Sequence, residues 1–349
     1  MKIRSLSGEE IAAIFALLII GVSSLLLLYR MSPNYFQKQA SFWLIGIILY
    51  LLIKTSTFHP KNWQKADWFI YLAIIILLIV PIFFGQNIRG SSRWITMGNF
   101  SFQPSEITKP FFVFAITSFC LRWQKNPRKH LILSSLLSFF PAILILIQPD
   151  LGSAFVFLAG AVAAILLSSK RKKLVLKTYA LLAVIGLVAA TIFLPYYQKE
   201  RIVTFLNPQK DPLGSGYNLI QSKIAIGSGQ WLGRGFGTGE QTRLMFLPEK
   251  HTDFIFASFA EASGLAGVIV ILVAYLIMFL TIRHMIIKAD DKFGSVFKTA
   301  LFLQIWLQAV INIAMNLGLA PITGLPLPFF SYGGSSIIAS FISLAFIFK

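Results

Sequence analysis

The chain has 349 residues, of which 56% are hydrophobic and only 13% are charged. Soluble domains carry about 25% charged residues, so this composition excludes a water-soluble globular protein. The formal net charge of +18 would suit a nucleic-acid-binding protein. The basic residues, however, are spread over short segments between apolar blocks, as in membrane proteins. We therefore expect a membrane protein with no nucleic-acid partner.

Apolar blocks of membrane-spanning length follow one another along the chain. Those at residues 11–29 and 178–194 contain no charged residue, and at about 1.5 Å per residue they suit a hydrocarbon core about 30 Å thick. The blocks are continuously apolar, which favours helices over the alternating strands of a barrel. We predict an all-α polytopic membrane protein of about ten transmembrane helices, at residues 11–29, 36–53, 68–84, 105–121, 131–148, 152–169, 178–194, 253–282, 299–318 and 330–348.

The chain shows no second kind of domain. The first apolar block lacks a small-residue cleavage site and is followed at once by another span, so we expect a retained helix. No soluble domain or internal repeat is visible, and the single cysteine, Cys120, excludes an internal disulfide. Residues 1–349 are predicted to form one transmembrane domain.

The basic residues predict the orientation. With the N-terminus in the cytoplasm, the cytoplasmic tails and loops hold most of the basic residues, including the run at 170–173 (KRKK). The short outer segments hold only Arg30, Lys38, Arg89, Arg93 and Lys109. By the positive-inside rule, both termini are cytoplasmic. The segments that then face outward are 85–104, 195–252 and 320–329.

The segment 195–252 is a long extracytoplasmic loop between the seventh and eighth predicted helices. Loops of this length are usually functional or disordered, and the apolar content of this one argues against disorder. Tyr217, Ile220 and Ile224 recur at helical spacing, so residues 217–226 are predicted to form an amphipathic helix on the membrane surface. The glycines between 227 and 239 would let backbone N–H groups approach a phosphate, but neither a P-loop nor a Rossmann fingerprint is present.

Four acidic residues fall in or near the outer half of the predicted spans: Glu106, Asp150, Asp253 and Glu261. A charge at a helix centre costs at least about 2.5–3.5 kcal/mol on insertion scales, so each needs a partner or a function. Glu106 and Lys109 lie three residues apart on one helix face. They form either a self-neutralising ion pair or, together with Arg93, an anion-binding patch.

Asp253 and Glu261 lie eight residues apart on the predicted eighth helix, where both can border one cavity. The structural alternative is an N-cap role for Thr252 or Asp253. An N-cap does not explain the second acid, so a functional role is favoured. His251 is either a proton shuttle or an interfacial side chain.

Four amides recur every four residues in the predicted ninth helix, at Gln304, Gln308, Asn312 and Asn316. Such a stripe favours hydrogen bonds between helices. Asn316, near the outer end, is the candidate for a functional exception. The sequence contains no GxSxG elbow, HExxH pair or His/Cys cluster, so a serine hydrolase or a zinc protease is not indicated.

Three outward segments together resemble one family. They are 90–95 (GSSRWI) with 103–109 (QPSEITK), 246–256 (FLPEKHTDFIF), and 321–336 (PITGLPLPFFSYGGSS). In this order, they resemble the SEDS family (shape, elongation, division and sporulation) over almost the whole chain. The segment 221–229 (QSKIAIGSG) and the Phe-Leu-Pro at 246–248 resemble the elongation branch, RodA, more than the division branch, FtsW.

The resemblance implies a peptidoglycan glycosyltransferase of the bacterial cytoplasmic (inner) membrane that polymerises lipid II into a nascent glycan strand during elongation. It implies a class B penicillin-binding protein transpeptidase and other elongation-complex membrane proteins as partners. Asp253 matches the family's essential carboxylate, and Glu106 and Lys109 match its paired polar residues. Many members carry two adjacent acids where this chain has Glu261 and Ala262, so a role for a second acid here is less certain by resemblance alone.

The implied reaction inverts the anomeric centre, because an α-linked pyrophosphate donor gives a β-linked product. A single general base then suffices, and Asp253 is the candidate. Charge on the leaving pyrophosphate would be stabilised by Arg93, Lys109, Arg243, Lys250 or a divalent cation such as Mg²⁺ or Mn²⁺. We expect no organic cofactor. Glu261, Asn316 and Ser331 complete the candidate substrate-binding residues.

Two other functions fit a helical membrane protein with polar residues. A lipid II flippase would place polar groups near the midplane and often shows inverted repeats, whereas the acids here cluster outward. A non-catalytic scaffold of a cell-wall complex explains the helices but not Asp253 together with Glu261.

The orientation is testable by cysteine labelling in intact cells, in a background where Cys120 is replaced by alanine. We expect a membrane-impermeant thiol reagent to label cysteines introduced into 195–252 and to leave those in 170–173 unlabelled, because the positive-inside rule places these segments on opposite sides. Labelling of 170–173 from outside would reverse the orientation.

Overall fold

The computed structural model describes residues 8–56, 60–88, 91–97, 100–193, 196–214, 216–289 and 291–349. Three residues of the predicted segments lie outside these ranges: Gly90, which begins 90–95, Leu194, which ends the span 178–194, and Pro195, which begins the long loop. Each of the ten predicted spans coincides with a helix: α1 (Gly8–Met31), α2 (Pro33–Thr55), α3 (Asp67–Phe84), α4 (Pro104–Trp123), α5 (Pro127–Ile147), α6 (Leu151–Ser168), α7 (Lys172–Phe193), α11 (Ile255–Ile287), α12 (Lys292–Leu317) and α13 (Gly334–Phe348).

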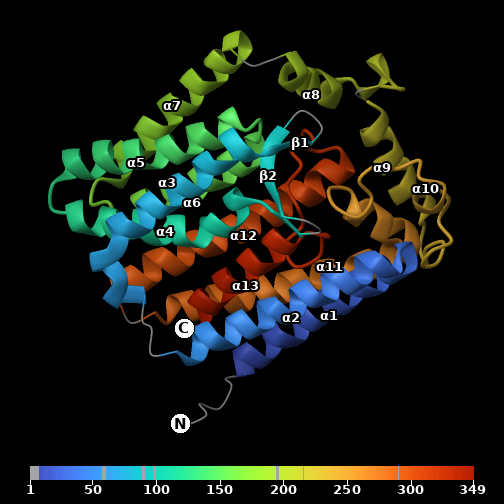
Figure 1. Ribbon diagram of the computed structural model, residues 1–349, viewed down its shortest axis with the longest axis horizontal. Helices are drawn as coiled ribbons and strands as arrows, with labels where there is room; N and C mark the ends of the chain where they lie inside the picture. The colour runs from blue at the N-terminus through green and yellow to red at the C-terminus, as the bar shows by residue number, and fades with distance from the viewer. Residues whose placement is uncertain are drawn as a thin grey trace. The chain divides into compact units, whose positions relative to one another are not determined.

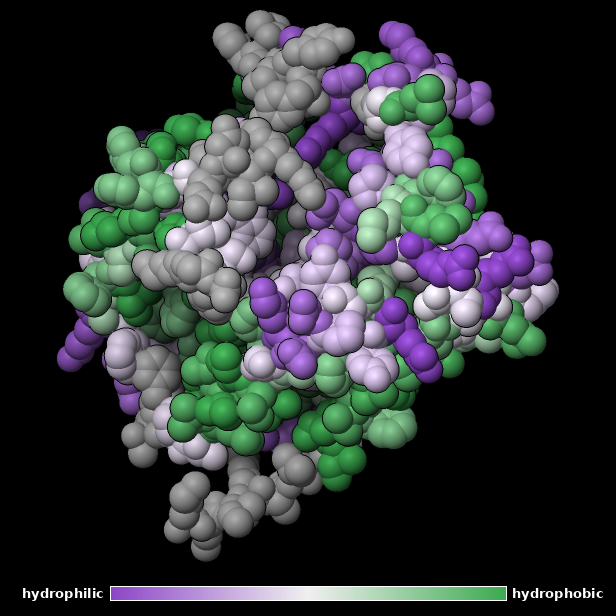
Figure 2. Space-filling model, turned by 45° about the vertical axis from the view of Figure 1, so that its right-hand side comes forward, coloured by the Kyte–Doolittle hydropathy of each residue, from purple (hydrophilic) through white to green (hydrophobic). Residues whose placement is uncertain are grey.

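The helices are those of a multi-pass membrane protein. Within the described ranges, 7 helices are long and apolar enough to cross a membrane, namely α1, α2, α3, α5, α6, α11 and α12, and α13 is a shorter apolar helix. Large apolar side chains are exposed along these helices, for example Phe15 and Val22 on α1. Figure 2 shows such residues (green) over large areas of the visible face. This exposure suits a lipid solvent, while the exact number of spans stays a prediction.

The chain divides into two compact units. Unit 1 comprises Met1–Leu51, Arg201–Lys288 and Gln308–Phe348, and unit 2 comprises Leu52–Glu200, Ala289–Leu307 and Lys349. Predicted site residues fall in both units, so each unit is treated separately below.

In unit 1, α1 packs along α11, and α13 also contacts α11 (Figure 1). The face that α1 buries is a helical stripe that includes Ala13, Ala16 and Ile20. Small residues let membrane helices approach closely, and at Gly21 a side chain would meet the Trp43 ring of α2. α13 is mostly apolar and is buried at nearly every position. Its buried Ser340 and Ser343 donate to carbonyl oxygens of the same helix.

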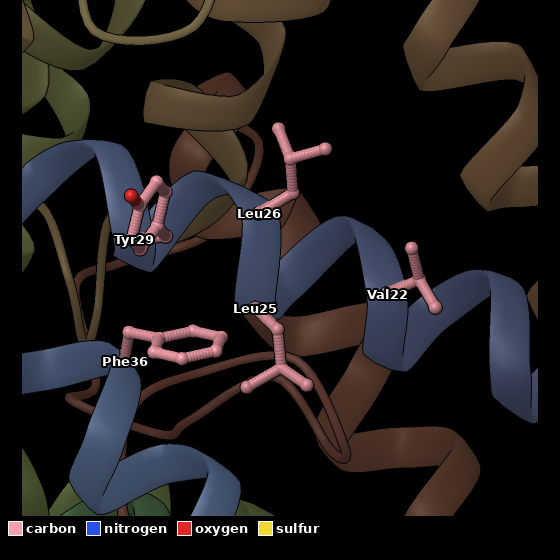
Figure 3. A pocket seen from close by; sticks show the side chains of 5 residues that line it. All are labelled: Val22, Leu25, Leu26, Tyr29 and Phe36. Carbon is pink, nitrogen blue, oxygen red and sulfur yellow. The ribbon is translucent and has the colours of Figure 1, made fainter. Parts of the chain in front are cut away.

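Unit 1 also contains an apolar groove of about 390 Å³ on α1 and the start of α2. Figure 3 shows its lining, which consists of Val22, Leu25, Leu26, Tyr29 and Phe36. The Tyr29 and Phe36 rings meet edge to face, with centroids 5.4 Å apart. The lining residues include no charged side chain, so the groove carries none of the predicted chemistry.

In unit 2, α3, α4, α5 and α6 pack against one another (Figure 1). The outward segment before α4 forms a small antiparallel sheet that the sequence analysis does not predict. Its strands, in spatial order, are β1 (Gln86–Ile88), β2 (Ser91–Met97) and β3 (Phe100–Phe102). In its register, Ile95 pairs with Phe102 and Met97 with Phe100. β2 contacts both α3 and α4, and it carries Arg93.

The long loop contains the helices α8 (Tyr196–Leu206), α9 (Tyr217–Ser228) and α10 (Glu240–Arg243), and a 3-10 turn at Pro208–Lys210. A second 3-10 turn, at Pro60–Ala66, lies outside this loop and precedes α3. The predicted helix in the loop is confirmed as α9. Its buried face consists of Leu219, Ser222 and Ala225 and packs against α11. Ile224, which was predicted to lie on the apolar face, is exposed.

Candidate functional site

Asp253 lies at the end of a short turn that leads into α11. Its side chain is partly exposed, while Phe254 after it is buried. α11 begins at Ile255 and its N-cap position is Phe254, which forms no side-chain cap. The structural alternative of an N-cap role for Thr252 or Asp253 is therefore wrong, because both residues precede the cap position.

The backbone of this turn is held by side chains of a helix that is distant in sequence. Asn312 and Asn316 of α12 both donate from Nδ2 to the carbonyl oxygen of Asp253, over 3.1 and 3.0 Å. The Oδ1 of Asn316 accepts from the N–H of Ala257 over 3.0 Å. That N–H lies in the first turn of α11 and has no intrahelical acceptor. Asn316 is thus a remote cap of α11, and the amide stripe is confirmed as hydrogen-bonding between segments.

A second loop fastens the same turn. The hydroxyl of Ser331 donates to the carbonyl oxygen of Thr252 over 2.8 Å and accepts from the N–H of Leu327 over 2.7 Å. The N–H of Tyr332 donates to the carbonyl oxygen of His251 over 2.9 Å. The carbonyls of residues 251–253 are therefore all hydrogen-bonded outside the turn. Because both hydrogen bonds of the Ser331 hydroxyl are internal, its predicted contact with substrate stays a prediction.

Two buried polar side chains of the first helices hold this second loop. Ser24 of α1 donates to the carbonyl oxygen of Phe330 over 2.6 Å, and Gln39 of α2 donates to that of Ser331 over 3.0 Å. Both side chains are fully buried. Sequence reasoning missed them, because Ser24 follows Ser23 and Gln39 lies beside Gln37 and Lys38, so neither stands out among its neighbours.

Three rings meet beside the turn. Tyr35 and His251 stack with centroids 4.5 Å apart and planes 11° apart. Tyr332 lies 5.1 Å from the Tyr35 ring and 5.6 Å from His251. Burial, and then the nearby Tyr35, raise the pKa of Tyr332 above its usual value. His251 therefore packs against the rings of Tyr35 and Tyr332, and these contacts hold its side chain in place.

Glu261 is buried, with 1% of its surface exposed. Its carboxylate accepts hydrogen bonds from the N–H of Gln241 over 2.8 Å, the N–H of Thr242 over 3.0 Å and the hydroxyl of Thr242 over 2.5 Å. Lys250 donates from Nζ to the carbonyl oxygen of Thr242. Burial lowers the pKa of Lys250, and the charge of Glu261 partly opposes this shift. Arg243, on the same short helix, is exposed.

In unit 2, Asp150 gathers the polar groups around Arg93. Its carboxylate lies 3.2 Å from Nη1 of Arg93 and accepts from Nε2 of Gln103 over 3.0 Å. It also caps α6, by accepting from the N–H and the hydroxyl of Ser153 over 3.0 and 2.8 Å. Asp150 thus fixes the guanidinium of Arg93, which is 22% exposed. From the sequence, Asp150 is predicted only as an outer acid, without a partner.

Glu106 and Lys109 of α4 form the predicted ion pair, with Nζ 2.5 Å from Oε1. Both residues are buried, with 2% and 5% of their surfaces exposed. A buried charge is stable only when it is paired, so this contact agrees with the structural interpretation of the two residues. Their predicted contact with substrate stays a prediction.

The structure therefore groups the predicted residues unit by unit. Unit 1 brings together Asp253, Lys250, Asn316 and Ser331 around one turn. Glu261 contacts α10, whose N–H groups it binds. Unit 2 holds Arg93, Glu106 and Lys109. Within the described ranges, no group of three His, Cys, Asp or Glu residues could hold a metal ion. Mg²⁺ often uses one carboxylate together with substrate phosphates, so the expected divalent cation stays a prediction, with no ligand assigned to it.

Comparison with known proteins agrees with these observations. The profile of the family described as cell cycle protein, which includes FtsW, RodA and SpoVE, matches residues 6–349. The peptidoglycan glycosyltransferase MrdB of Escherichia coli (strain K12) is 35% identical over 295 residues, which cover 84% of this chain and 80% of MrdB. The probable peptidoglycan glycosyltransferase FtsW of Marinobacter nauticus is 36% identical over 299 residues, which cover 82% of this chain and 72% of that protein.

Solved structures share the fold. A chain of the structure described as "Structural coordination of polymerization and crosslinking by a peptidoglycan synthase complex" is 28% identical, with a TM-score of 0.81, and the match covers 96% of this chain and 95% of that one. The crystal structure of Thermus thermophilus rod shape determining protein RodA is 23% identical, with a TM-score of 0.71, over 96% of this chain and 94% of that one. The second likeness concerns the fold alone.

The Glu106–Lys109 contact gives a stability prediction. Reversing one charge alone, as Glu106→Lys or Lys109→Glu, leaves two like charges buried together, and breaking a buried pair typically costs about 3–5 kcal/mol. We expect the double reversal to recover most of the thermal stability lost by each single variant. Unfolding of the purified variants in detergent measures this. If the double reversal also recovers full activity, the pair is purely structural.

Proposed function

Because the chain belongs to the FtsW/RodA/SpoVE family of cell cycle proteins, we propose that it is a peptidoglycan glycosyltransferase of the bacterial cytoplasmic membrane. Its substrate is lipid II, which it polymerises on the outer face during elongation. The observation that carries the proposal is the fixed turn at Asp253, where a partly exposed aspartate lies on a backbone held by hydrogen bonds from Asn312, Asn316, Ser331 and Tyr332.

In the proposed reaction, Asp253 is the general base. A hydroxyl oxygen of the acceptor sugar attacks the anomeric carbon of the donor, and its proton passes to the Asp253 carboxylate. The bond from the anomeric carbon to the pyrophosphate oxygen breaks, and undecaprenyl pyrophosphate leaves as an anion. A base works only within hydrogen-bond reach of its proton, which is why a fixed backbone at Asp253 supports the role.

The leaving anion needs positive charge, because no acid is required to protonate it. Arg93 is the best placed candidate in unit 2, since Asp150 orients its guanidinium and part of its surface stays exposed. A planar guanidinium matches the oxygens of a phosphate. In unit 1, Arg243 is exposed, whereas Lys250 already donates to Thr242. Arg93 and Arg243 are therefore the preferred candidates, ahead of Lys109 and Lys250.

The flippase and scaffold alternatives are separated from the enzyme by one experiment. Purified protein in detergent has no membrane across which to move lipid II, so a carrier or a scaffold forms no product there. We expect glycan polymer when lipid II is added to the purified protein and its partner. Absence of polymer, with the partner present and both proteins folded, would favour the carrier or the scaffold.

Replacing Asp253 by asparagine tests the base directly. Asparagine keeps the size of the side chain but does not take the proton, and a positioned base contributes about 10²–10⁴-fold in rate. We expect Asp253→Asn to lower the polymerisation rate by at least about 100-fold, measured as glycan chains formed from lipid II.

The matched control is Asp211→Asn, the same change on an exposed aspartate of the long loop. The oxygen of Asp211 accepts from the N–H of Gly214 over 3.1 Å, a contact that asparagine can also form. We expect the control to polymerise at the wild-type rate. Asp253→Asn should unfold at about the wild-type temperature, because the hydrogen bonds that hold the turn end on backbone carbonyl oxygens, which the substitution keeps. Asp211→Asn should do the same, because it keeps the acceptor of the Gly214 N–H. Near wild-type polymerisation by Asp253→Asn would eliminate Asp253 as the base.

We further propose that a class B penicillin-binding protein is the crosslinking partner. The similar solved structure concerns polymerization and crosslinking by a synthase complex. The described part of this chain consists of apolar helices, a small sheet and a loop with short helices, and we assign crosslinking to a second protein. Other elongation-complex membrane proteins stay predicted partners.

Co-purification tests this partner. We expect a co-expressed, single-span class B penicillin-binding protein to remain bound through size-exclusion chromatography in detergent, and to raise the polymerisation rate. The control is the same partner without its transmembrane segment. No association, together with an unchanged rate, would refute the partnership.

A further inference from the structure

Glu261 is the buried acid whose role the sequence leaves open. Its two carboxylate oxygens already accept three hydrogen bonds, from two backbone N–H groups and one hydroxyl of residues 241 and 242. A carboxylate offers about four acceptor positions, so most of its capacity is used inside the protein. Only 1% of its surface is exposed, so it offers a substrate almost no accessible surface.

Charges of opposite sign contact the backbone of α10. Glu261 binds N–H groups near its N-terminus, while the Lys250 ammonium binds the carbonyl oxygen of Thr242. Anions favour the N-terminal end of a helix and cations favour exposed carbonyls, so both contacts stabilise this turn. The carbonyl oxygen of Lys250 in turn accepts from the hydroxyl of Ser258 over 3.1 Å. The chain between α10 and Asp253 is therefore fastened at Lys250 by both its side chain and its backbone.

The backbone near Glu261 also binds the long loop, because α11 is broken at Gly264. This residue has φ 63° and ψ −167°, a conformation open essentially to glycine alone. The break leaves backbone N–H and carbonyl groups of α11 without partners in the helix itself. The glycine-rich segment supplies their hydrogen-bond partners. The carbonyl oxygens of Glu261 and Ala262 accept from the N–H groups of Arg234 and Gly235 over 2.8 and 3.0 Å.

The other side of the break is satisfied in the same way. The N–H groups of Leu265 and Ala266 donate to the carbonyl oxygens of Gln230 and Trp231 over 2.8 and 3.0 Å. The long loop thus replaces hydrogen bonds that α11 loses. Glu261 lies three residues before the break, and its side chain and its backbone each bind a different part of this loop.

We propose that Glu261 is a positioning residue that acts through α10 and Lys250 to hold the Asp253 turn in place, and that it does not contact substrate. The inference rests on the proposed function, in which Asp253 is the base. It deepens that function by giving a different role to a residue that the sequence analysis places among the substrate-binding candidates. The hydrogen-bond chain runs from Glu261 through Thr242 and Lys250 to the turn.

Kinetics of matched variants test the proposal. Glu261→Gln turns one acceptor oxygen into an N–H₂ group that faces backbone donors, and Thr242→Val removes the hydroxyl from the same contact. Both changes displace the base without touching substrate, so we expect kcat to fall by about tenfold or more while KM for lipid II stays within about twofold. The double variant should be no slower than Glu261→Gln alone, because both substitutions disrupt the same contact, between residues 261 and 242.

Two conservative variants act as controls. Thr242→Ser keeps the hydroxyl, and we expect it to keep the wild-type kcat. Thr299→Val removes a hydroxyl that binds only its own helix, at the carbonyl oxygen of Ser295, and should also leave kcat unchanged. A rise in KM at constant kcat for Glu261→Gln, or wild-type kinetics of Thr242→Val, would overturn the positioning role and return Glu261 to the substrate site.

Hydrogen exchange separates this inference from the proposed function. In Glu261→Gln and Thr242→Val, we expect peptides that cover residues 239–250 to exchange faster than in the wild type, while peptides from α6 stay unchanged. This readout needs no activity. If the wild-type protein forms no glycan, the proposed function fails, and exchange still decides whether Glu261 holds α10. Unchanged exchange in both variants would refute the positioning role.

Discussion

The hydrogen bonds that end on the carbonyl oxygens of residues 251–253 are the contacts on which the rest of unit 1 depends. Their donors come from two places distant in sequence, α12 and the loop before α13. A buried polar group left without a partner costs about 1–3 kcal/mol. Satisfying these carbonyls therefore stabilises the turn, and it also fixes where the Asp253 carboxylate stands.

The same constraint reaches back to the first two helices. Ser24 and Gln39 are fully buried polar side chains of α1 and α2, and both bind the loop that carries Ser331. Apolar contacts between membrane helices are similar at many registers, whereas a hydrogen bond requires two particular atoms to meet. A few buried polar residues therefore define how α1 and α2 meet this loop, while the apolar surface serves mainly to contact lipid.

Buried side chains complete the N-termini of α6, α11 and α10. Asp150 caps α6, Asn316 caps α11, and the Glu261 carboxylate caps α10. Asp150 and Asn316 also bind a second segment, through Gln103 and the carbonyl oxygen of Asp253, so that capping and tertiary positioning are performed by one group. For a catalytic carboxylate this is useful, because rate depends on geometry within about 0.5 Å, and a turn fixed only by its own sequence would move more.

The sequence by itself determined the helices, because a continuous apolar block of membrane length has only one conformation that satisfies its backbone in lipid. It also indicated α9 and the Glu106–Lys109 pair, whose residues lie within one or two turns of each other. It missed the small sheet at Arg93, since two of its three strands have only 3 residues, too few to show an alternating pattern.

Only the tertiary structure decided the roles of the polar residues. The bond from Asp150 to the Ser153 N–H spans three residues, within reach of a sequence pattern. Glu261 meets Thr242 across 19 residues, and Asn316 meets Ala257 across 59. A local cap follows from spacing along one chain segment, but a remote one depends on which helices pack together. Packing of the helices sets both which polar residues are buried, such as Gln39, and which donor each buried acceptor finds.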